Sequence, residues 1–272
     1  MLPASTWFKA SDDANIVYET HGDPASQRRV LLVHSLAMDR AYWRPVADRL
    51  AKAGAVVAAL DCRGHGGSDK PKGPYAMDRF ADDLRDLLDH LGWDKAVVGG
   101  SSMGGSVTLA FASRHPARAA GLALIDTTAW YGEDAPKAWA GRANAALETG
   151  LASLIEFQLS RWFGDAFKAE HPGVVKACVD TFLANDVAAY AAVCVMLGGF
   201  DLRGKLASIK TPTRIVVGEE DYATPPAMAQ LLHRGIAGST CLLLPKARHL
   251  TPLERPDEVA AEIAALLGAA KG

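Results

Sequence analysis

Cysteine is scarce in this chain of 272 residues, and the four cysteines, Cys62, Cys178, Cys194 and Cys241, form no CxxC pair. Such scattered cysteines favour neither a zinc site nor a disulfide framework. The first nine residues also lack the cationic stretch, followed by an apolar one, that begins a secretory leader. We therefore expect free thiols, a cytoplasmic location and no metal site built from cysteines.

Neither charge nor apolar length points to a nucleic acid or a membrane. Lys and Arg number 29 against 31 Asp and Glu, for a net charge of −2 without a basic stripe. A nucleic-acid or anionic-membrane partner would normally require such a stripe. No apolar run approaches the roughly 20 residues that span a bilayer. We expect a small-molecule partner, and the sequence carries no signal of oligomeric state.

What the chain does contain is an alternation of strand and helix patterns, with 49% hydrophobic residues to build a core. Apolar runs predict buried strands at 30–33, 55–60 and 122–125, and strand signals also occur at 96–99, 213–217 and 241–244. Apolar residues at helical spacing predict helices at 42–53, 77–91, 105–114, 226–235 and 257–267. Alternating elements of this kind indicate an α/β fold with a mostly parallel central sheet and helices on both faces.

The alternation stops for about 80 residues after the strand at 122–125, and only helical patterns fill 127–206. This segment is too long for a structureless loop. We expect a core made of residues 1–126 and 207–272, with 127–206 inserted as a helical lid. Ligands of parallel sheets bind beyond the carboxyl ends of the strands, so the lid should lie there.

The pentapeptide Gly100-Ser101-Ser102-Met103-Gly104 lies between a predicted strand and a predicted helix. A sharp strand-to-helix turn exposes its apex hydroxyl, and glycines two residues before and after the apex let the backbones approach. Only Ser102 has glycine at both offsets, which makes it the candidate nucleophile. A plain turn whose serine caps the helix is the alternative.

Asp221 and His249 lie just past the ends of the strands at 213–217 and 241–244, so the chain order is Ser, Asp, His. A serine hydroxyl needs an imidazole base, and that imidazole needs a carboxylate to hold its tautomer. Glu219, Glu220 and Asp126 are the alternative acids.

Other histidines and acids are expected to have structural or surface roles. His34 should orient the loop that follows it, and His65 should stiffen its glycine-rich loop. We expect the remaining histidines and the polar face of the helix at 77–91 to be solvated. These are His21, His90, His115, His171 and His233, with Asp82, Asp83, Arg85, Asp86 and Asp89 on the helix.

The loop at 34–38 should supply an oxyanion donor. The backbone N–H of Leu36 would join that of Met103 in binding the developing alkoxide, and one such donor is typically worth roughly 3 kcal/mol. A plain βα turn is the alternative for this loop.

At this point the whole chain resembles the α/β-hydrolases, with oxyanion loop, elbow, lid, acid loop and histidine loop in order. Within them it is most similar to the 3-oxoadipate enol-lactonases. The stretches that carry this likeness are 34–39, 63–68, 102–105, Arg161-Trp162-Phe163, 200–203 and 221–226. Two positions depart from the lactonase pattern, because His34 and Ala37 stand where asparagine and glycine are usual.

The resemblance also implies a substrate pocket containing Ser35, Trp139, Arg142 and Trp162. Trp139 would stack on the substrate ring, and the guanidinium of Arg142 would pair with a carboxylate. By helical spacing alone, Trp139 could equally be a packing residue and Arg142 a surface one.

The sequence thus predicts a serine hydrolase that cleaves a small ester or lactone through an acyl-enzyme, most similar to an enol-lactonase and needing no metal or organic cofactor. The alternatives are a general carboxylesterase, a carbon–carbon bond hydrolase of meta-cleavage products, a cofactor-free haloperoxidase or perhydrolase, and a receptor-like protein with slow hydrolysis.

Overall fold

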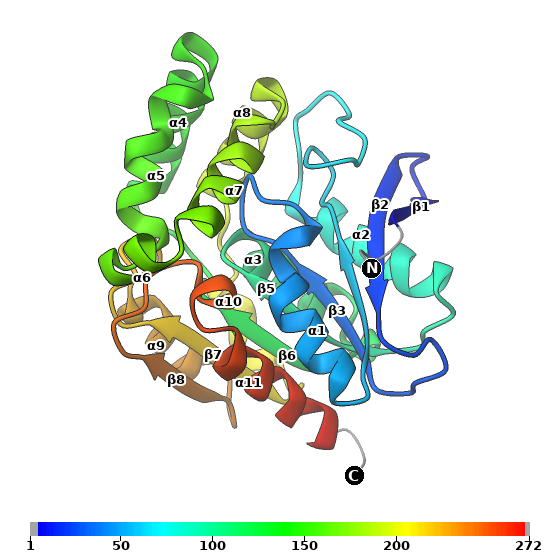
Figure 1. The fold of residues 1–272 in the computed structure, drawn as a ribbon. Coiled ribbons are helices and arrows are strands. Elements are labelled where there is room, and N and C mark those ends of the chain that lie inside the picture. Colours follow the sequence, from blue (N-terminus) through cyan, green and yellow to red (C-terminus); the bar gives the residue numbers. More distant parts are fainter. Residues whose placement is uncertain (1–4, 270–272) are drawn as a thin grey trace.

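Eight strands form one sheet in residues 5–269, the part of the chain that the computed structural model describes (Figure 1). They are β1 (Ser5–Lys9), β2 (Asn15–His21), β3 (Arg29–Val33), β4 (Val56–Leu60), β5 (Ala96–Ser101), β6 (Ala119–Ile125), β7 (Thr213–Gly218) and β8 (Thr240–Leu244). Across the sheet the order is β1-β2-β4-β3-β5-β6-β7-β8. All neighbours from β4 to β8 are parallel, whereas β2 is antiparallel to β1 and to β4. The predicted, mostly parallel sheet is confirmed.

The six segments predicted as strands correspond to β3 through β8, whereas β1 and β2 were not predicted. Every residue of β4 and β5 is buried, which explains the continuous apolar runs. In β2, by contrast, buried and partly exposed residues are mixed and the strand contains charged side chains. A strand of this kind has no clear apolar signal in the sequence.

Helices cover both faces of the sheet, as predicted. Helices α1 (Arg44–Lys52) and α11 (Pro256–Ala269) pack together on one face, and α2 (Met77–His90) and α3 (Met103–Arg114) pack on the other (Figure 1). The remaining core helices are α9 (Pro226–Gly235), which packs on β7 and β8, and the short α10 (Thr251–Glu254). Four 3-10 segments also occur: η1 (Arg40–Trp43), η2 (Pro116–Arg118), η3 (Leu151–Leu154) and η4 (Arg203–Ser208).

Five helices lie between β6 and β7, in the segment predicted as an insertion: α4 (Ala135–Thr149), α5 (Ile155–Trp162), α6 (Asp165–Glu170), α7 (Pro172–Leu183) and α8 (Val187–Gly198). They rest on the loops beyond the carboxyl ends of the strands (Figure 1). The amide of Leu250 donates to the carbonyl of Trp162 at 3.0 Å, and Asn185 Nδ2 donates to the carbonyl of Ala37 at 2.9 Å. Residues 1–4 and 270–272 of the predicted core are outside the described residues.

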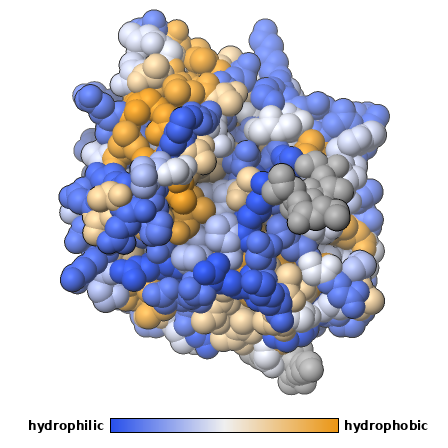
Figure 2. All heavy atoms as spheres, in the orientation of Figure 1, coloured by the Kyte–Doolittle hydropathy of each residue, from blue (hydrophilic) through white to orange (hydrophobic). Residues whose placement is uncertain are grey.

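Hydrophobic surface gathers over these five helices in Figure 2. The large hydrophobic side chains exposed there are Leu147, Phe157, Leu183 and Val195. Within residues 5–269, no single helix is long and apolar enough to cross a membrane; α7 and α8 reach that length and hydropathy together, but a bend of 96° separates them.

Three expectations about polar residues are wrong, and one of them concerns Asp82 on α2, which is buried against Arg114 and His115. His21 is buried on β2, because its ring lies between the carboxylates of Glu19 (3.1 Å) and Asp48 (2.9 Å). Asp83 on α2 is also buried, since the guanidinium of Arg63 binds both of its carboxylate oxygens at 2.7 Å. Sequence patterns show where polar residues occur, but not which of them find a buried partner of opposite charge.

Candidate active site

The turn between β5 and α3 holds Ser102 in a strained backbone conformation. Its φ of 56° lies in the left-handed region, where side chains are rare. A Cβ atom on Gly100 would lie 2.0 Å from the carbonyl oxygen of Gly104, and one on Gly104 would lie 2.1 Å from the carbonyl oxygen of Val33. Both positions therefore require glycine, and the turn has the close packing expected of a nucleophile elbow.

Three side chains meet at this turn in a continuous hydrogen-bonded series. Nε2 of His249 lies 2.9 Å from Oγ of Ser102, and Nδ1 of His249 lies 2.8 Å from Oδ2 of Asp221. Thr224 supports the acid through its hydroxyl (2.9 Å to Oδ2) and its amide (2.9 Å to Oδ1). The amide of Ala223 donates to the same Oδ1 at 2.8 Å. Asp221 is thus held in one orientation, with an oxygen directed at the imidazole.

The alternative acids have other partners. Glu219 accepts a hydrogen bond from the amide of Lys246, and Glu220 lies 3.6 Å from the guanidinium of Arg248. Asp126 is fully buried at the end of β6, where its carboxyl faces Gly218 and Thr251. None of the three has a hydrogen bond with His249 among the described residues.

His34 and His65 are buried side by side, with ring centroids 5.0 Å apart. Burial lowers the pKa of His34 to about 4 and that of His65 to about 3, so both rings are neutral near pH 7. Nε2 of His34 accepts from the amide of Cys62 (2.9 Å), so Nδ1 donates to the carbonyl of Ser35 (2.8 Å). His65 Nδ1 lies 3.1 Å from the carbonyl of Arg63. His34 thus contacts the loop that it was predicted to orient, and His65 contacts the loop that it was predicted to stiffen.

The predicted oxyanion donors are the backbone amides of Met103 and Leu36. Met103 is the first residue of α3, and Leu36 lies in the loop after β3, where the adjacent Ala37 has a φ of 60°. Neither amide donates a hydrogen bond to another described residue. Free N–H groups at a helix start and in a strained loop are suitable donors for a negatively charged oxygen.

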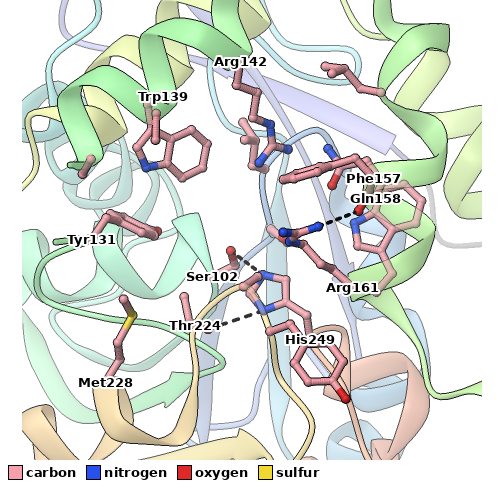
Figure 3. Close-up of a pocket in the computed structure, with 18 of the residues that line it drawn as sticks. Ser102, Tyr131, Trp139, Arg142, Phe157, Gln158, Arg161, Thr224, Met228 and His249 are labelled. Atoms are coloured by element: carbon pink, nitrogen blue, oxygen red, sulfur yellow. Dashed lines mark hydrogen bonds between the residues drawn. The ribbon is translucent and has the colours of Figure 1, made fainter.

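A cavity of about 570 Å³ opens above Ser102 and His249 (Figure 3). Its walls include all four residues predicted for the substrate pocket, Ser35, Trp139, Arg142 and Trp162. Leu36, one of the two predicted oxyanion donors, also lines the cavity. Asp221 and Met103 are buried and do not line the cavity. Within residues 5–269, no three His, Cys, Asp or Glu side chains are grouped as metal ligands would be.

One wall of the cavity carries two positive charges. The guanidinium carbons of Arg142 and Arg161 lie 5.4 Å and 3.7 Å from the ring centroid of Phe157, which separates them. Nε of Arg142 donates to the hydroxyl of Tyr190 at 2.5 Å. Burial and the charge of Arg142 lower the pKa of Arg161. Within the described part of the chain, neither arginine has a carboxylate within ion-pair distance, so this wall offers two uncompensated cations.

The side of the cavity opposite Arg161 is mainly apolar and aromatic. Figure 3 shows Tyr131, Trp139 and Met228 across the cavity from Phe157 and Arg161, with Ser102 between the two sides. The rings of Tyr131 and Trp139 meet edge to face, with centroids 5.3 Å apart. The guanidinium carbon of Arg142 lies 5.0 Å from the ring centroid of Trp139, so the cationic and aromatic parts of the lining adjoin on α4.

Several residues of these walls were not predicted as site residues, among them Tyr131, Phe157, Gln158, Arg161 and Met228. Phe157, Gln158, Arg161 and the predicted Trp162 recur at helical spacing along α5, and all four line the cavity. That spacing, with one cation and one amide among aromatic residues, could have identified the face of α5 that lines the pocket.

A serine on a strand-to-helix elbow, hydrogen-bonded to a histidine and an aspartate from later strands of a mostly parallel sheet, defines the class of the α/β hydrolases. Residues 28–256 match the family described as the alpha/beta hydrolase fold, and the chain belongs to that family.

Within this family, the chain is similar to enol-lactonases and to an esterase. The chain is 30% identical to 3-oxoadipate enol-lactonase 2 of Acinetobacter baylyi over 246 residues, which is 90% of each protein. The crystal structure of the enol-lactonase from Burkholderia xenovorans superimposes with a TM-score of 0.92 at 31% identity, over 97% of this chain and 100% of that one. A thermophilic esterase from Thermogutta terrifontis, with malate bound, has a TM-score of 0.90 at 29% identity, over 99% and 100%.

Proposed function

We propose that this hydrolase cleaves small carboxylate-bearing lactones or esters through an acyl-enzyme, with enol-lactones as the leading substrates. The observation that carries the proposal is the pair of uncompensated guanidiniums, Arg142 and Arg161, in the same cavity as Ser102. An arginine pair without carboxylate partners suits a bound anion, because guanidinium groups bind carboxylates in a bidentate manner.

Acylation would begin when Oγ of Ser102 attacks the ester carbonyl while Nε2 of His249 takes the hydroxyl proton. Asp221 holds the imidazole tautomer through Nδ1 and stabilises the imidazolium that forms. The N–H groups of Leu36 and Met103 bind the oxyanion of the tetrahedral intermediate. Collapse of that intermediate breaks the bond to the ring oxygen, which takes the proton from His249 and remains attached to the acyl chain.

Deacylation would follow by the same groups in reverse. His249 takes a proton from water, the hydroxide attacks the acyl carbon, and Ser102 leaves with the proton returned by the imidazole. The product is a hydroxy acid. When the leaving oxygen is an enol, it tautomerises to the ketone, which draws the ring opening toward completion.

The positions of the other wall residues support an anionic cyclic substrate. Trp139 and Tyr131 offer aromatic rings to a ring or an alkyl segment, and Ser35 and Trp162 also border the cavity. The lactonase names of two relatives and the malate bound to the esterase agree with a small anionic acid.

We also propose that α4 to α8, within 127–206, act as the lid that selects the substrate. Arg142 lies on α4 and Arg161 on α5, so the cationic wall belongs wholly to this segment. The nucleophile and its base belong to the sheet loops. Chemistry and specificity would then be carried by different parts of the chain.

A general carboxylesterase is the second candidate. The cavity volume of about 570 Å³ lies within the range of pockets for drug-sized ligands, which leaves room for more than a small lactone. The likeness to an esterase of 29% identity points the same way.

One set of assays tests both parts of the proposal. Hydrolysis would be measured with the 4-nitrophenyl monoester of succinic acid, which is anionic, with neutral 4-nitrophenyl butyrate of the same acyl length, and with 3-oxoadipate enol-lactone. Ser102→Ala should lower kcat on all three by about 10⁴-fold or more. Arg142→Gln and Arg161→Gln should each raise KM about tenfold for the anionic substrates, because a hydrogen bond to a charged group is lost.

The matched control is Arg203→Gln, which removes an exposed arginine paired with Asp201. It should leave KM for every substrate within about twofold, as surface substitutions usually do. Full activity of Ser102→Ala would overturn the mechanism. If wild type and the two arginine variants have equal KM values for the succinate monoester, the result favours the general esterase. A single turnover per protein would favour a receptor-like role.

A further inference from the structure

Asp126 is a buried carboxyl that the proposed mechanism does not use. It follows β6 directly, its side chain is fully inaccessible, and its φ of 48° is in the left-handed region. A non-glycine residue keeps such a conformation only where its surroundings hold it there, and such residues cluster at functional sites.

The carboxyl of Asp126 joins the two loops that carry the acid and the base. Oδ1 accepts from the amide of Gly218 at 3.2 Å, three residues before Asp221. Oδ2 accepts from the amide of Thr251 at 3.1 Å and lies 2.6 Å from its hydroxyl, two residues after His249. A single side chain therefore fixes the start of the acid loop against the end of the histidine loop.

The residues on either side of Asp126 hold the nucleophile. The carbonyl of Ile125 accepts from the amide of Ser102 at 2.9 Å, and the hydroxyl of Thr127 donates to the carbonyl of Ser102 at 2.7 Å. The end of β6, residues 125–127, thus contacts all three segments that carry the triad, although none of its side chains bonds to the imidazole.

We propose that Asp126 is a positioning residue, which sets the distances among Ser102, His249 and Asp221 by tying Gly218 to Thr251. This inference rests on the proposed hydrolase function. Small errors in such distances are costly, since a displacement of about 1 Å in an active site can lower the rate about 100-fold.

The environment of Asp126 suits a fixed structural bridge better than a second base. Burial, and then the charge of Asp221, raise the pKa of Asp126 well above its usual range. The donors around it are a backbone amide on one loop and an amide and hydroxyl on the other. Gly218 and Thr251, which carry these donors, are both buried, so the bridge has a defined length.

The test compares Asp126→Asn with Thr251→Val and Thr251→Ser on 4-nitrophenyl butyrate. In Asp126→Asn an amide NH2 must face one of the two backbone N–H donors, so we expect the loops to separate and kcat to fall about 10- to 100-fold with KM within about twofold. Thr251→Val, which removes only the hydroxyl bond, should lower kcat about five- to tenfold. Thr251→Ser, which keeps that bond, should restore the wild-type kcat.

The pH profile separates positioning from loss of folded protein. If His249 moves away from Asp221, its imidazolium is less stabilised, and the acid limb of the kcat/KM profile moves to lower pH. A purely structural defect would scale the profile down without moving it. Asp83→Asn is the control, because it removes an equally buried carboxylate that pairs with Arg63 instead. It should lower Tm but leave the profile in place.

An unmoved acid limb and a kcat within twofold of wild type in both Asp126→Asn and Thr251→Val would overturn the inference. If Asp126→Asn fails to fold, Thr251→Val against Thr251→Ser decides it. Ser102→Ala keeps the two conclusions separate. An inactive Ser102→Ala beside a fully active Asp126→Asn refutes only the positioning role, whereas an active Ser102→Ala refutes the hydrolase mechanism itself.

Discussion

Gly104 lies where the helix after the elbow passes closest to the predicted oxyanion loop. A Cβ atom there would be 2.1 Å from the carbonyl oxygen of Val33 and 2.7 Å from that of His34. These two carbonyls precede Leu36, so any added atom must displace the loop that holds a predicted oxyanion donor. The size of this one residue therefore affects both packing and the proposed chemistry.

We predict that Gly104→Ala lowers the free energy of unfolding by about 1–3 kcal/mol, the usual cost of overpacking, and lowers kcat at least tenfold. The matched control is Gly141→Ala on α4, where an added Cβ meets nothing within 4 Å. It should stabilise the protein by about 0.5–1 kcal/mol through helix propensity. Urea unfolding and ester hydrolysis would measure both variants, and wild-type stability and kcat in Gly104→Ala would contradict the prediction.

Residues differ in how far the sequence indicates their place. The turn around Ser102 is a local feature, so its glycines and its serine are recognisable in five residues. Asp221 and His249 follow strand ends, and the structure brings them to Ser102 as expected. Arg161 and Asp126 are different. Their surroundings come from segments far away in the chain, which no local pattern describes.

At the scale of elements, β2 and the segment that begins α1 are joined through the carboxylate of Glu19. Nε and Nη2 of Arg44 donate to its two oxygens at 2.9 and 2.8 Å, and His21 lies 3.1 Å away. Burial alone would raise the pKa of Glu19, but the hydrogen bonds from His21 and Arg44 lower it to about 2. Glu19 is therefore an ionised, fully buried link between a strand and a helix.

This link should make stability depend on pH in a defined window. Because the pKa of Glu19 is lower in the folded protein, its contribution is complete above its ordinary value of about 4.3 and is lost as the pH falls toward 2. We predict that Glu19→Gln lowers the free energy of unfolding at pH 7 by about 3 kcal/mol, with a smaller difference from wild type below pH 4.

Urea unfolding at several pH values would measure this difference. Glu148→Gln, on the exposed side of α4, should change stability by less than about 0.5 kcal/mol at every pH. A constant gap between wild type and Glu19→Gln from pH 7 to pH 2.5 would contradict the assigned pKa.

The burial and the polar content of each strand explain which strands could be predicted from the sequence. Strands β3 to β7 are largely buried, so their sequences are mainly apolar and alternate with amphipathic helices. Strand β2 keeps polar residues such as Glu19 and His21 in buried positions, because arginine and aspartate partners compensate them. Pairing with partners elsewhere in the chain is what hides this strand from sequence analysis.

For the whole molecule, burial divides the chain into a tightly packed sheet and a looser group of helices. All residues of β4 and β5 are buried. Helix α6 has no buried residue, α5 has only Gln158 and Trp162, and α7 has only Cys178 and Phe182. Helix α8 differs from them, because most of its residues are buried and it packs along α4.

Amide hydrogen exchange should follow this division, because segments with few buried apolar contacts open at low free energy. We predict that β4 and β5 exchange most slowly, that α8 approaches their protection, and that α5 to α7 exchange at least about tenfold faster. The mobile part of the proposed lid would then be narrower than 127–206.

Saturating succinate, as an anionic ligand, should slow exchange in α4 and α5, which carry Arg142 and Arg161. It should leave α2 unchanged as an internal control, because no residue of α2 lines the cavity. Equal protection of α5 to α7 and β5 without ligand would mean that these helices are a fixed part of the core. Substrate selection would then depend on the shape of a rigid cavity rather than on closure of the helices over a bound anion.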